Sequence, residues 1–182
     1  MINEQDFEYV RSTVRQVPNF PHEGILFLDI TTATKDAKSM QLMVDFLYEK
    51  FKDEKIDYIA GVESRGFIFG AALAYRLNVG FIPIRKPNKL PAETIKESYS
   101  LEYGTDTIEM HADAIKNGDR VVIIDDLLAT GGTAVAACNL VKKAGGKAVA
   151  AAFIIELDPL KGREKIEQTG VPVVSMLNYD LD

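Results

Sequence analysis

The stretch VVIIDDLLATGGT, residues 121–133, joins an apolar run to a pair of carboxylates and a glycine turn. The branched apolar residues that follow Arg120 predict a buried strand over 120–125. The next segment, GGTAVAACNLVKKAGG, predicts a helix that begins at the turn and ends at glycines. A strand followed directly by a helix is typical of an α/β fold.

The same alternation continues on both sides of this stretch. Runs of Val, Ile and Ala without polar alternation predict parallel strands that are buried on both faces. We therefore expect an α/β fold with a mostly parallel central sheet flanked by helices. Strands are predicted at 56–62, 79–84, 120–125, 147–157 and 171–177; helices at 4–15, 36–52, from ESRG to about 77, at 131–146 and between the last two strands; a loop at 17–24; and an extended segment at 25–30. The helix that ends near residue 77 carries an apolar stripe of Ile68, Ala71, Ala72 and Tyr75.

Residues 85–110, called the hood below, interrupt this alternation. They are polar, contain Pro87 and Pro91, and include two short alternating segments around Tyr103-Gly104, which predict a flexible loop carrying a hairpin. So long an interruption is a candidate active-site lid. Without a linker elsewhere, we expect residues 1–182 to form a single domain with the hood inserted in it.

Composition narrows the classes of function and partner. The net charge of −6 disfavours nucleic acid and anionic membranes as partners. Cys138 is the one cysteine, so no disulfide forms within the chain, which fits a reducing compartment. No secretory signal is apparent in MINEQDFEYV, and no apolar run approaches the roughly 20 residues of a membrane span. The expectation is a cytoplasmic protein.

The turn after Asp126 has the composition of a phosphate site. A helix start offers unpaired backbone N–H groups and the positive end of the helix dipole. Gly131 and Gly132 allow close approach of the backbone to a ligand, while Thr130 and Thr133 add hydroxyl donors. Neither of the common nucleotide-binding glycine motifs, GxxxxGK[ST] and G-x-G-x-x-G, is present.

Asp125 and Asp126 repel a phosphate but suit the hydroxyls of a sugar, because each carboxylate accepts hydrogen bonds from a cis-diol. A diol site beside a phosphate site predicts a ribose 5-phosphate ligand. The alternative is that an aspartate caps the next helix, but a cap accounts for one carboxylate and not for the pair.

The quoted stretch resembles the phosphoribosyl diphosphate signature of the type I phosphoribosyltransferases. FPHEGILFLDIT, IDYIAGVESRGFIFG, IRKPNKLP, SYSLEYG and LKGREK resemble the adenine-using members of that family, in the same order and over nearly the whole chain. The resemblance implies transfer of a 5-phosphoribosyl group from phosphoribosyl diphosphate to N9 of adenine, with AMP and diphosphate as products. It also implies a requirement for Mg²⁺ and a homodimer.

The resemblance also assigns roles to residues. It implies that the 5-phosphate binds Ala129, Thr130, Gly131, Gly132 and Thr133, the ribose binds Asp125 and Asp126, and the diphosphate binds Glu63, Ser64 and Arg65 together with Arg85, Lys86 and Lys89. Glu102 is the implied general acid or base, Arg65 assists catalysis, and Tyr103 helps to close the site. Phe27 is implied to stack on adenine, and the backbone of Leu26 to read the base edge. Leu28 stands where the family commonly has a basic residue.

Several of these roles have ordinary structural alternatives. From the residues alone, ESRG is equally a helix-capping turn, Leu26 and Phe27 are core residues, RKPNK is an exposed loop, and Glu102 is a solvated hairpin carboxylate. No direct metal ligand is assigned, because Mg²⁺ is expected to be held mainly by substrate oxygens and water.

Two other functions stay open. One is a phosphoribosyltransferase for a 6-oxopurine such as xanthine, against which ILFLDI and SYSLEYG favour adenine. The other is a regulator that senses phosphoribosyl diphosphate without catalysis, which the acidic composition disfavours.

Overall fold

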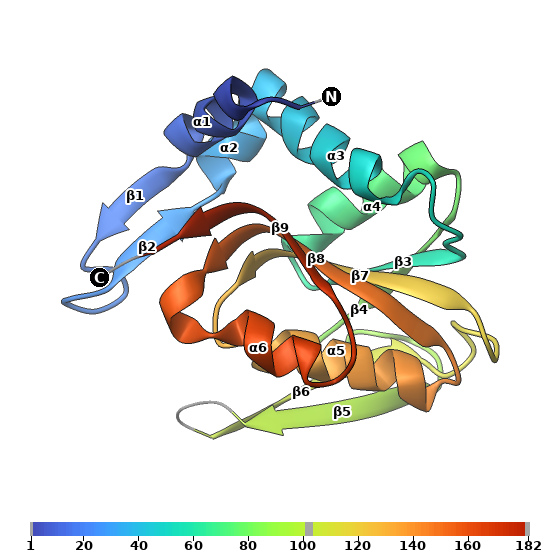
Figure 1. Cartoon of the computed structure of the whole chain (residues 1–182). Coiled ribbons are helices and arrows are strands. Elements are labelled where there is room, and N and C mark those ends of the chain that lie inside the picture. The colour runs from blue at the N-terminus through green and yellow to red at the C-terminus, as the bar shows by residue number, and fades with distance from the viewer. Residues whose placement is uncertain (1, 101–103, 181–182) are drawn as a thin grey trace.

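The computed structural model describes residues 2–100 and 104–180, and Figure 1 shows how the elements are arranged. In chain order these are α1 (Glu4–Thr13), β1 (Arg15–Pro18), β2 (Leu26–Asp29), α2 (Thr31–Lys35), α3 (Ala37–Phe51), β3 (Tyr58–Val62), α4 (Gly66–Leu77), β4 (Gly80–Ile84), β5 (Thr94–Ser100), β6 (Thr105–His111), β7 (Arg120–Leu128), α5 (Gly132–Lys143), β8 (Lys147–Leu157), a 3₁₀ turn (Asp158–Leu160), α6 (Gly162–Glu167) and β9 (Val173–Tyr179).

The central sheet has the strand order β4-β3-β7-β8-β9, and every pair in it is parallel. Two antiparallel hairpins, β1-β2 and β5-β6, stand outside this sheet. The α/β architecture expected from the sequence is therefore confirmed. In such a sheet the carboxyl ends of the strands lie along one edge, where ligands bind in open α/β folds.

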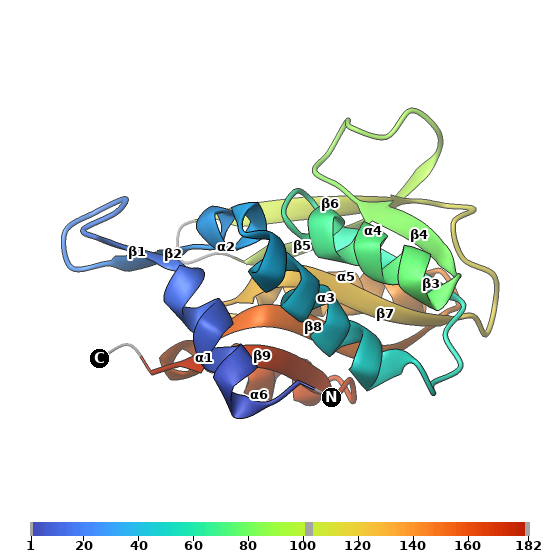
Figure 2. The ribbon, with the colours of Figure 1, turned by 90° about the horizontal axis from the view of Figure 1, so that it is seen from above.

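Helices cover both faces of the sheet. Helices α1, α3 and α4 lie on one face, and α5 and α6, with the β5-β6 hairpin beyond them, lie on the other (Figures 1 and 2). This double cover explains the unbroken apolar strands, because residues 121–124 of β7 are all fully buried. Within the described residues, no helix combines the length and the hydropathy that a membrane crossing requires.

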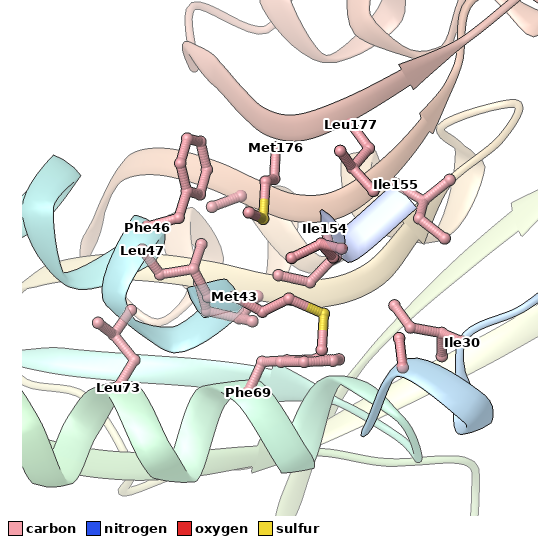
Figure 3. Packing of buried hydrophobic residues seen from close by; sticks show 14 of the residues in the cluster. Ile30, Met43, Phe46, Leu47, Phe69, Leu73, Ile154, Ile155, Met176 and Leu177 are labelled. Carbon is pink, nitrogen blue, oxygen red and sulfur yellow. The ribbon is translucent and has the colours of Figure 1, made fainter. Parts of the chain in front are cut away.

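One hydrophobic core fills the space between α3, α4 and the last two strands. Met43 and Leu47 of α3 meet Phe69 and Leu73 of α4 beside Ile154 of β8, as Figure 3 shows. The apolar pattern of 36–52 thus builds α3 as expected, and the Asp36 carboxylate caps its start by accepting a bond of 2.8 Å from Ser39 N–H. On the other face, Cys138 is fully buried in the second core, and burial raises the pKa of its thiol to about 11.

The elements of the structure differ from the sequence-based prediction at several places. Residues 15–18 form β1, paired with β2, although most of this segment was expected to lie in a helix or loop. The short helix α2 was not expected, because five residues carry too little periodicity to be recognised. Strand β7 continues to Leu128 instead of ending at Asp125, because backbone pairing with β8 extends through Leu128 and Glu156.

The apolar stripe of α4 does not face the core. Phe69 and Leu73 are fully buried, whereas Ile68 and Tyr75 are 42% and 87% exposed. Because α4 is apolar on several sides, its periodicity alone does not decide which side packs inward.

Candidate active site

The predicted phosphate loop lies between β7 and α5. Ala129, Thr130, Gly131, Gly132 and Thr133 line one pocket together with Asp125. Gly131 has a left-handed backbone with φ of 80°, and no described side chain caps the helix that starts after it. The first N–H groups of α5 therefore border the pocket without a side-chain cap, as an anion-binding turn requires.

Asp125 connects this pocket to a second one. The neighbouring pocket is lined by Asp125 and Thr133 together with Glu63 and Lys86. Burial, and then the charge of Asp126, raise the pKa of Asp125 above the usual carboxyl range. A ligand that donates hydrogen bonds to Asp125 stabilises its ionised form, as sugar hydroxyls do.

Asp126 is buried and pairs with Arg65, which lies in the loop between β3 and α4. This contact brings two predicted site residues together from positions 61 residues apart in the chain. The Arg65 side chain is about half exposed, so it remains accessible from solvent. Ser64 is also exposed, and the Glu63–Ser64 peptide bond beside it is cis.

The hood cation Arg85 is held by Glu63. Arg85 Nε and Nη2 donate to the two Glu63 carboxylate oxygens at 3.1 and 3.0 Å, which is a bidentate pair. Arg85 Nη1 also donates to the carbonyl of Lys89 at 3.2 Å. Lys89 itself is exposed. The backbone N–H of Lys86 donates to Glu63 at 3.0 Å, and Arg85 lowers the pKa of Glu63.

Lys86 has partners on the β5-β6 hairpin. Its ammonium group pairs with Asp106, and the Tyr99 hydroxyl donates to the same carboxylate at 3.1 Å. Each of the cations Arg65, Arg85 and Lys86 is thus paired with a carboxylate, which competes with any anionic ligand for the same cation.

The predicted base-binding residues lie on the β1-β2 hairpin. Phe27 and Phe20 meet edge to face with ring centroids 5.1 Å apart, and both line an open pocket of about 560 Å³. Leu26 pairs with Pro18 in the same hairpin and is half-buried. Leu28 is 4% exposed and belongs to the hydrophobic core, so its side chain points away from the pocket.

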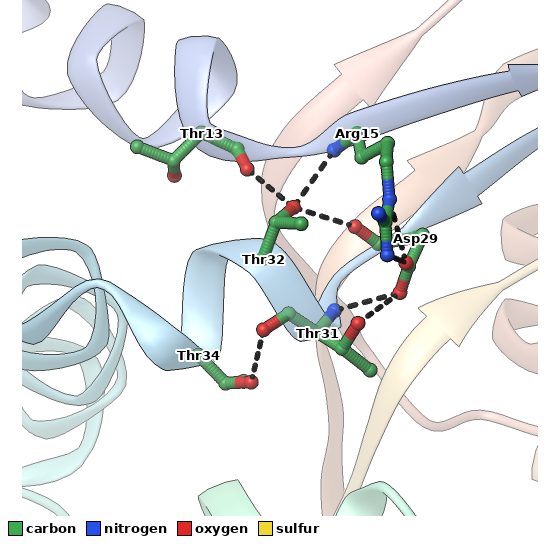
Figure 4. A network of polar contacts seen from close by, with 6 residues as sticks. All are labelled: Thr13, Arg15, Asp29, Thr31, Thr32 and Thr34. Carbon is green, nitrogen blue, oxygen red and sulfur yellow. Dashed lines mark hydrogen bonds and ion pairs between the residues drawn. The ribbon is translucent and has the colours of Figure 1, made fainter.

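A polar network fixes this hairpin to the helices beside it (Figure 4). Asp29 accepts from Arg15 at 2.6 Å and from the Thr31 hydroxyl at 2.6 Å. The Thr31 hydroxyl and then Arg15 lower the pKa of Asp29 to about 2, so it stays ionised at neutral pH. Thr32 accepts from Arg15 N–H at 3.0 Å and donates to the carbonyl of Thr13 at 2.6 Å.

Glu102 and Tyr103 lie outside the described residues. The residues just before them, Tyr99 and Ser100, lie beside the phosphate loop. A Cβ built on Gly132 would lie 3.2 Å from Tyr99 Cδ2 and 3.6 Å from the Ser100 carbonyl oxygen, so the end of β5 passes directly over the phosphate loop.

Comparison with known proteins decides the family. A model of the phosphoribosyl transferase domain matches residues 32–178. The chain belongs to the phosphoribosyltransferase family. An adenine phosphoribosyltransferase of Koribacter versatilis (strain Ellin345) is 54% identical over 171 residues, which are 94% of this chain and 93% of the relative.

Solved structures of phosphoribosyltransferases agree with this assignment. The adenine phosphoribosyltransferase of Thermoanaerobacter pseudethanolicus ATCC 33223 is 48% identical, with a TM-score of 0.91 over 95% of this chain and 99% of that one. The Saccharomyces cerevisiae adenine phosphoribosyltransferase, complexed with adenine and D-2,5-dideoxy-2,5-imino-altritol 1,6-bisphosphate, is 43% identical. Its TM-score is 0.89, over 96% of this chain and all of that one. The resemblance noted in the sequence is confirmed.

Some residues around this phosphoribosyltransferase site were missed from the sequence. Tyr99 and Asp106 contact Lys86 but belong to the hairpin, where polar residues are usually solvated. The one signal in the sequence is the alternation of residues along the two strands of the hairpin. Tyr99 and Asp106 are cross-strand partners, so their side chains lie on the same face.

Proposed function

We propose that this protein transfers the 5-phosphoribosyl group of phosphoribosyl diphosphate to N9 of adenine, releasing AMP and diphosphate. The observation that carries the proposal is that residues 129–133 and Asp125 line the same pocket near the carboxyl end of β7. Its amides suit a phosphate, and the neighbouring carboxylates suit a ribose diol. The similarity to adenine phosphoribosyltransferases supports adenine as the acceptor.

In this mechanism the ribose is held at both ends. The 5-phosphate lies against the amides of residues 129–133, and Asp125 and Asp126 accept hydrogen bonds from the ribose hydroxyls. Positive charge then builds on the sugar ring as its bond to the diphosphate oxygen breaks, as in other transfers through an oxocarbenium-like transition state. The two carboxylates stabilise that charge because they are close to it.

The diphosphate leaves toward the cations at the opposite side of the site. Arg65, Arg85, Lys86 and Lys89 neutralise the departing charge, with the Glu63-Ser64 segment beside them. Arg65, Arg85 and Lys86 exchange their carboxylate partners for the diphosphate as they do so. Arg65 moves from Asp126 to the diphosphate, which leaves Asp126 available to the ribose. Closure of the hood, with Tyr103 helping to cover the site, excludes water that would hydrolyse the donor.

Adenine binds in the pocket of the β1-β2 hairpin. Phe27 stacks on the base, and the backbone of Leu26 reads its edge. The burial of Leu28 supports a site without a charged contact at that position. Glu102 takes the proton that adenine loses when N9 forms its bond to the sugar.

Mg²⁺ supplies Lewis acidity toward the diphosphate when it is bound. Among residues 2–100 and 104–180, no group of three or more His, Cys, Asp or Glu side chains is arranged to hold a metal. Mg²⁺ would be held mainly by substrate oxygens and water, with Asp125 and Asp126 as the carboxylates beside the ribose.

A comparison of four purine bases as acceptors tests this proposal directly. Diphosphate release from phosphoribosyl diphosphate and Mg²⁺ is measured with adenine, hypoxanthine, guanine or xanthine as acceptor. We expect rapid release with adenine and little with the other three. Faster release with a 6-oxopurine would move the assignment to that class of acceptor, and tight binding of the donor without release would indicate a sensing protein.

A second prediction concerns Asp106. Its charge competes with the diphosphate for Lys86 and also repels that anion, so Asp106→Asn should tighten diphosphate binding roughly two- to fivefold. Isothermal calorimetry with magnesium diphosphate measures the effect. Asp113→Asn removes the same charge at the far end of the hairpin, where Asp113 is exposed, and should change little. Weaker binding by the Asp106 variant would mean that Asp106 serves to orient Lys86.

We also propose a homodimer in the cytoplasm, with residues 1–182 forming one domain. The exposed stripe of α4, which includes Ile68 and Tyr75, supports a surface that another subunit covers. The single buried cysteine is compatible with a reducing compartment.

A further inference from the structure

The first turn of α6 packs backbone against backbone on the phosphate loop. A Cβ built on Gly131 would lie 2.7 Å from the Gly162 carbonyl oxygen. In the other direction, a Cβ on Gly162 would overlap the Ala129 carbonyl oxygen and lie 3.0 Å from the Gly131 nitrogen. Real Cβ atoms keep larger distances, so only glycine at position 162 allows the two segments to approach this closely.

An ion pair between Arg163, which is partly exposed, and the buried Glu156 fixes α6 in this place. Arg163 Nε donates to Glu156 Oε1 at 2.8 Å, and Glu156 is 4% exposed. The same guanidinium donates to the Val173 carbonyl and to the Ser175 hydroxyl, each at 2.8 Å. Arg163 therefore joins α6 to both β8 and β9 through a planar group with several fixed donors.

The ion pair also lies close to the phosphate loop. Glu156 is the register partner of Leu128, the last residue of β7 before the loop begins. The loop is therefore supported from two directions, by the β7-β8 ladder at its start and by Gly162 along its middle. Glycine-rich loops have many accessible conformations, and ordering one on binding costs free energy. A support that fixes the loop beforehand lowers that cost.

We propose that Gly162 and Arg163 are positioning residues for the 5-phosphate, acting through the loop backbone and not by touching the substrate. This inference rests on the proposed function, because it takes residues 129–133 as the phosphate site. It predicts a loss specific to ligands that carry the 5-phosphate. Diphosphate, which is bound by the cations around Arg65 and the hood, should be unaffected.

The test uses calorimetric titration of the whole protein with two probes, ribose 5-phosphate and magnesium diphosphate. Gly162→Ala displaces the loop by the volume of a methyl group and should weaken ribose 5-phosphate on the order of 10-fold. Diphosphate affinity should stay within about twofold, because its site is separate. Equal affinity of the variant and wild type for ribose 5-phosphate would refute the positioning role.

Arg163 gives a second variant that does not depend on the fate of Gly162→Ala. Arg163→Met should weaken ribose 5-phosphate, and Arg163→Lys, which keeps the charge, should recover part of the affinity. Arg76→Met is the matched control, because Arg76 pairs with Asp45 between α4 and α3 away from the loop. If both Met variants lower the melting temperature and neither changes ribose 5-phosphate affinity, Arg163 only stabilises the fold.

The wild type separates this inference from the proposed function. Failure of wild-type protein to bind ribose 5-phosphate would overturn both. Binding by wild type that is insensitive to Gly162→Ala and Arg163→Met would overturn the positioning role alone.

Discussion

Protein in which Asp125 and Asp126 are both replaced by asparagine should bind phosphoribosyl diphosphate on the order of 10²-fold more weakly. Each substitution exchanges a charged acceptor for a neutral amide, so the hydrogen bonds from the ribose hydroxyls lose their charge assistance. Calorimetric titration with the donor and Mg²⁺ measures the loss. Unchanged donor affinity would refute the role of the pair in binding the diol.

Replacing Asp125 should not lower the stability of the fold. The folded-state pKa of Asp125 lies above its unfolded value, because burial and Asp126 disfavour its charge. Ionised Asp125 therefore opposes folding, and this cost grows as pH rises from the unfolded pKa through the folded one. Asp125→Asn should then melt at or above the wild-type temperature at neutral pH, with the difference vanishing near pH 4.

A matched control is found near Arg120, at the start of β7, the strand that carries Asp125 and Asp126. The Asp57 carboxylate accepts a bond of 2.8 Å from the N–H of Arg120, where β7 begins. Asp57→Asn also removes one negative charge beside β7 and keeps an acceptor in place, but it lies away from the pocket. Donor affinity should stay within about twofold of wild type in this variant.

The phosphate loop was predictable because its information is local. A left-handed residue needs a glycine, a helix needs a start, and both signals fall within the stretch 129–133. The short elements β1 and α2 give no such signal, because four or five residues do not establish a period. The extension of β7 depends on pairing with β8, which overrides the break in hydrophobicity at Asp125 and Asp126.

Contacts between distant parts of the chain were the least accessible to sequence reasoning. The sequence shows a basic run at 85–89 but not that Glu63 holds Arg85 or that Asp106 holds Lys86. Gly162 likewise belongs to a motif that resembles the family, yet its contact with the phosphate loop becomes visible only when α6 is placed beside β7. Such pairings follow from the tertiary fold and have no period of their own.

The second large effect is expected from Glu102. Glu102→Gln should lower turnover on the order of 10²-fold while the donor still binds, because the amide cannot accept the proton of adenine. Glu102 itself lies outside the described residues. Strand β5 ends at Ser100, whose carbonyl lies 3.6 Å from a Cβ built on Gly132, and Glu102 follows two residues later.

Steady-state rates with adenine, measured across pH, test whether Glu102 is a base. A base gives an acidic limb in the profile of kcat, where its protonation lowers the rate, and that limb should disappear in Glu102→Gln. Glu97→Gln is a suitable control, since Glu97 lies on the same hairpin but accepts from Asn139 of α5. Turnover of Glu102→Gln within a few-fold of wild type would remove Glu102 from the mechanism. Proton transfer would then belong to another group or to water, while the phosphate loop, the carboxylate pair and the cations would keep their roles in binding the donor.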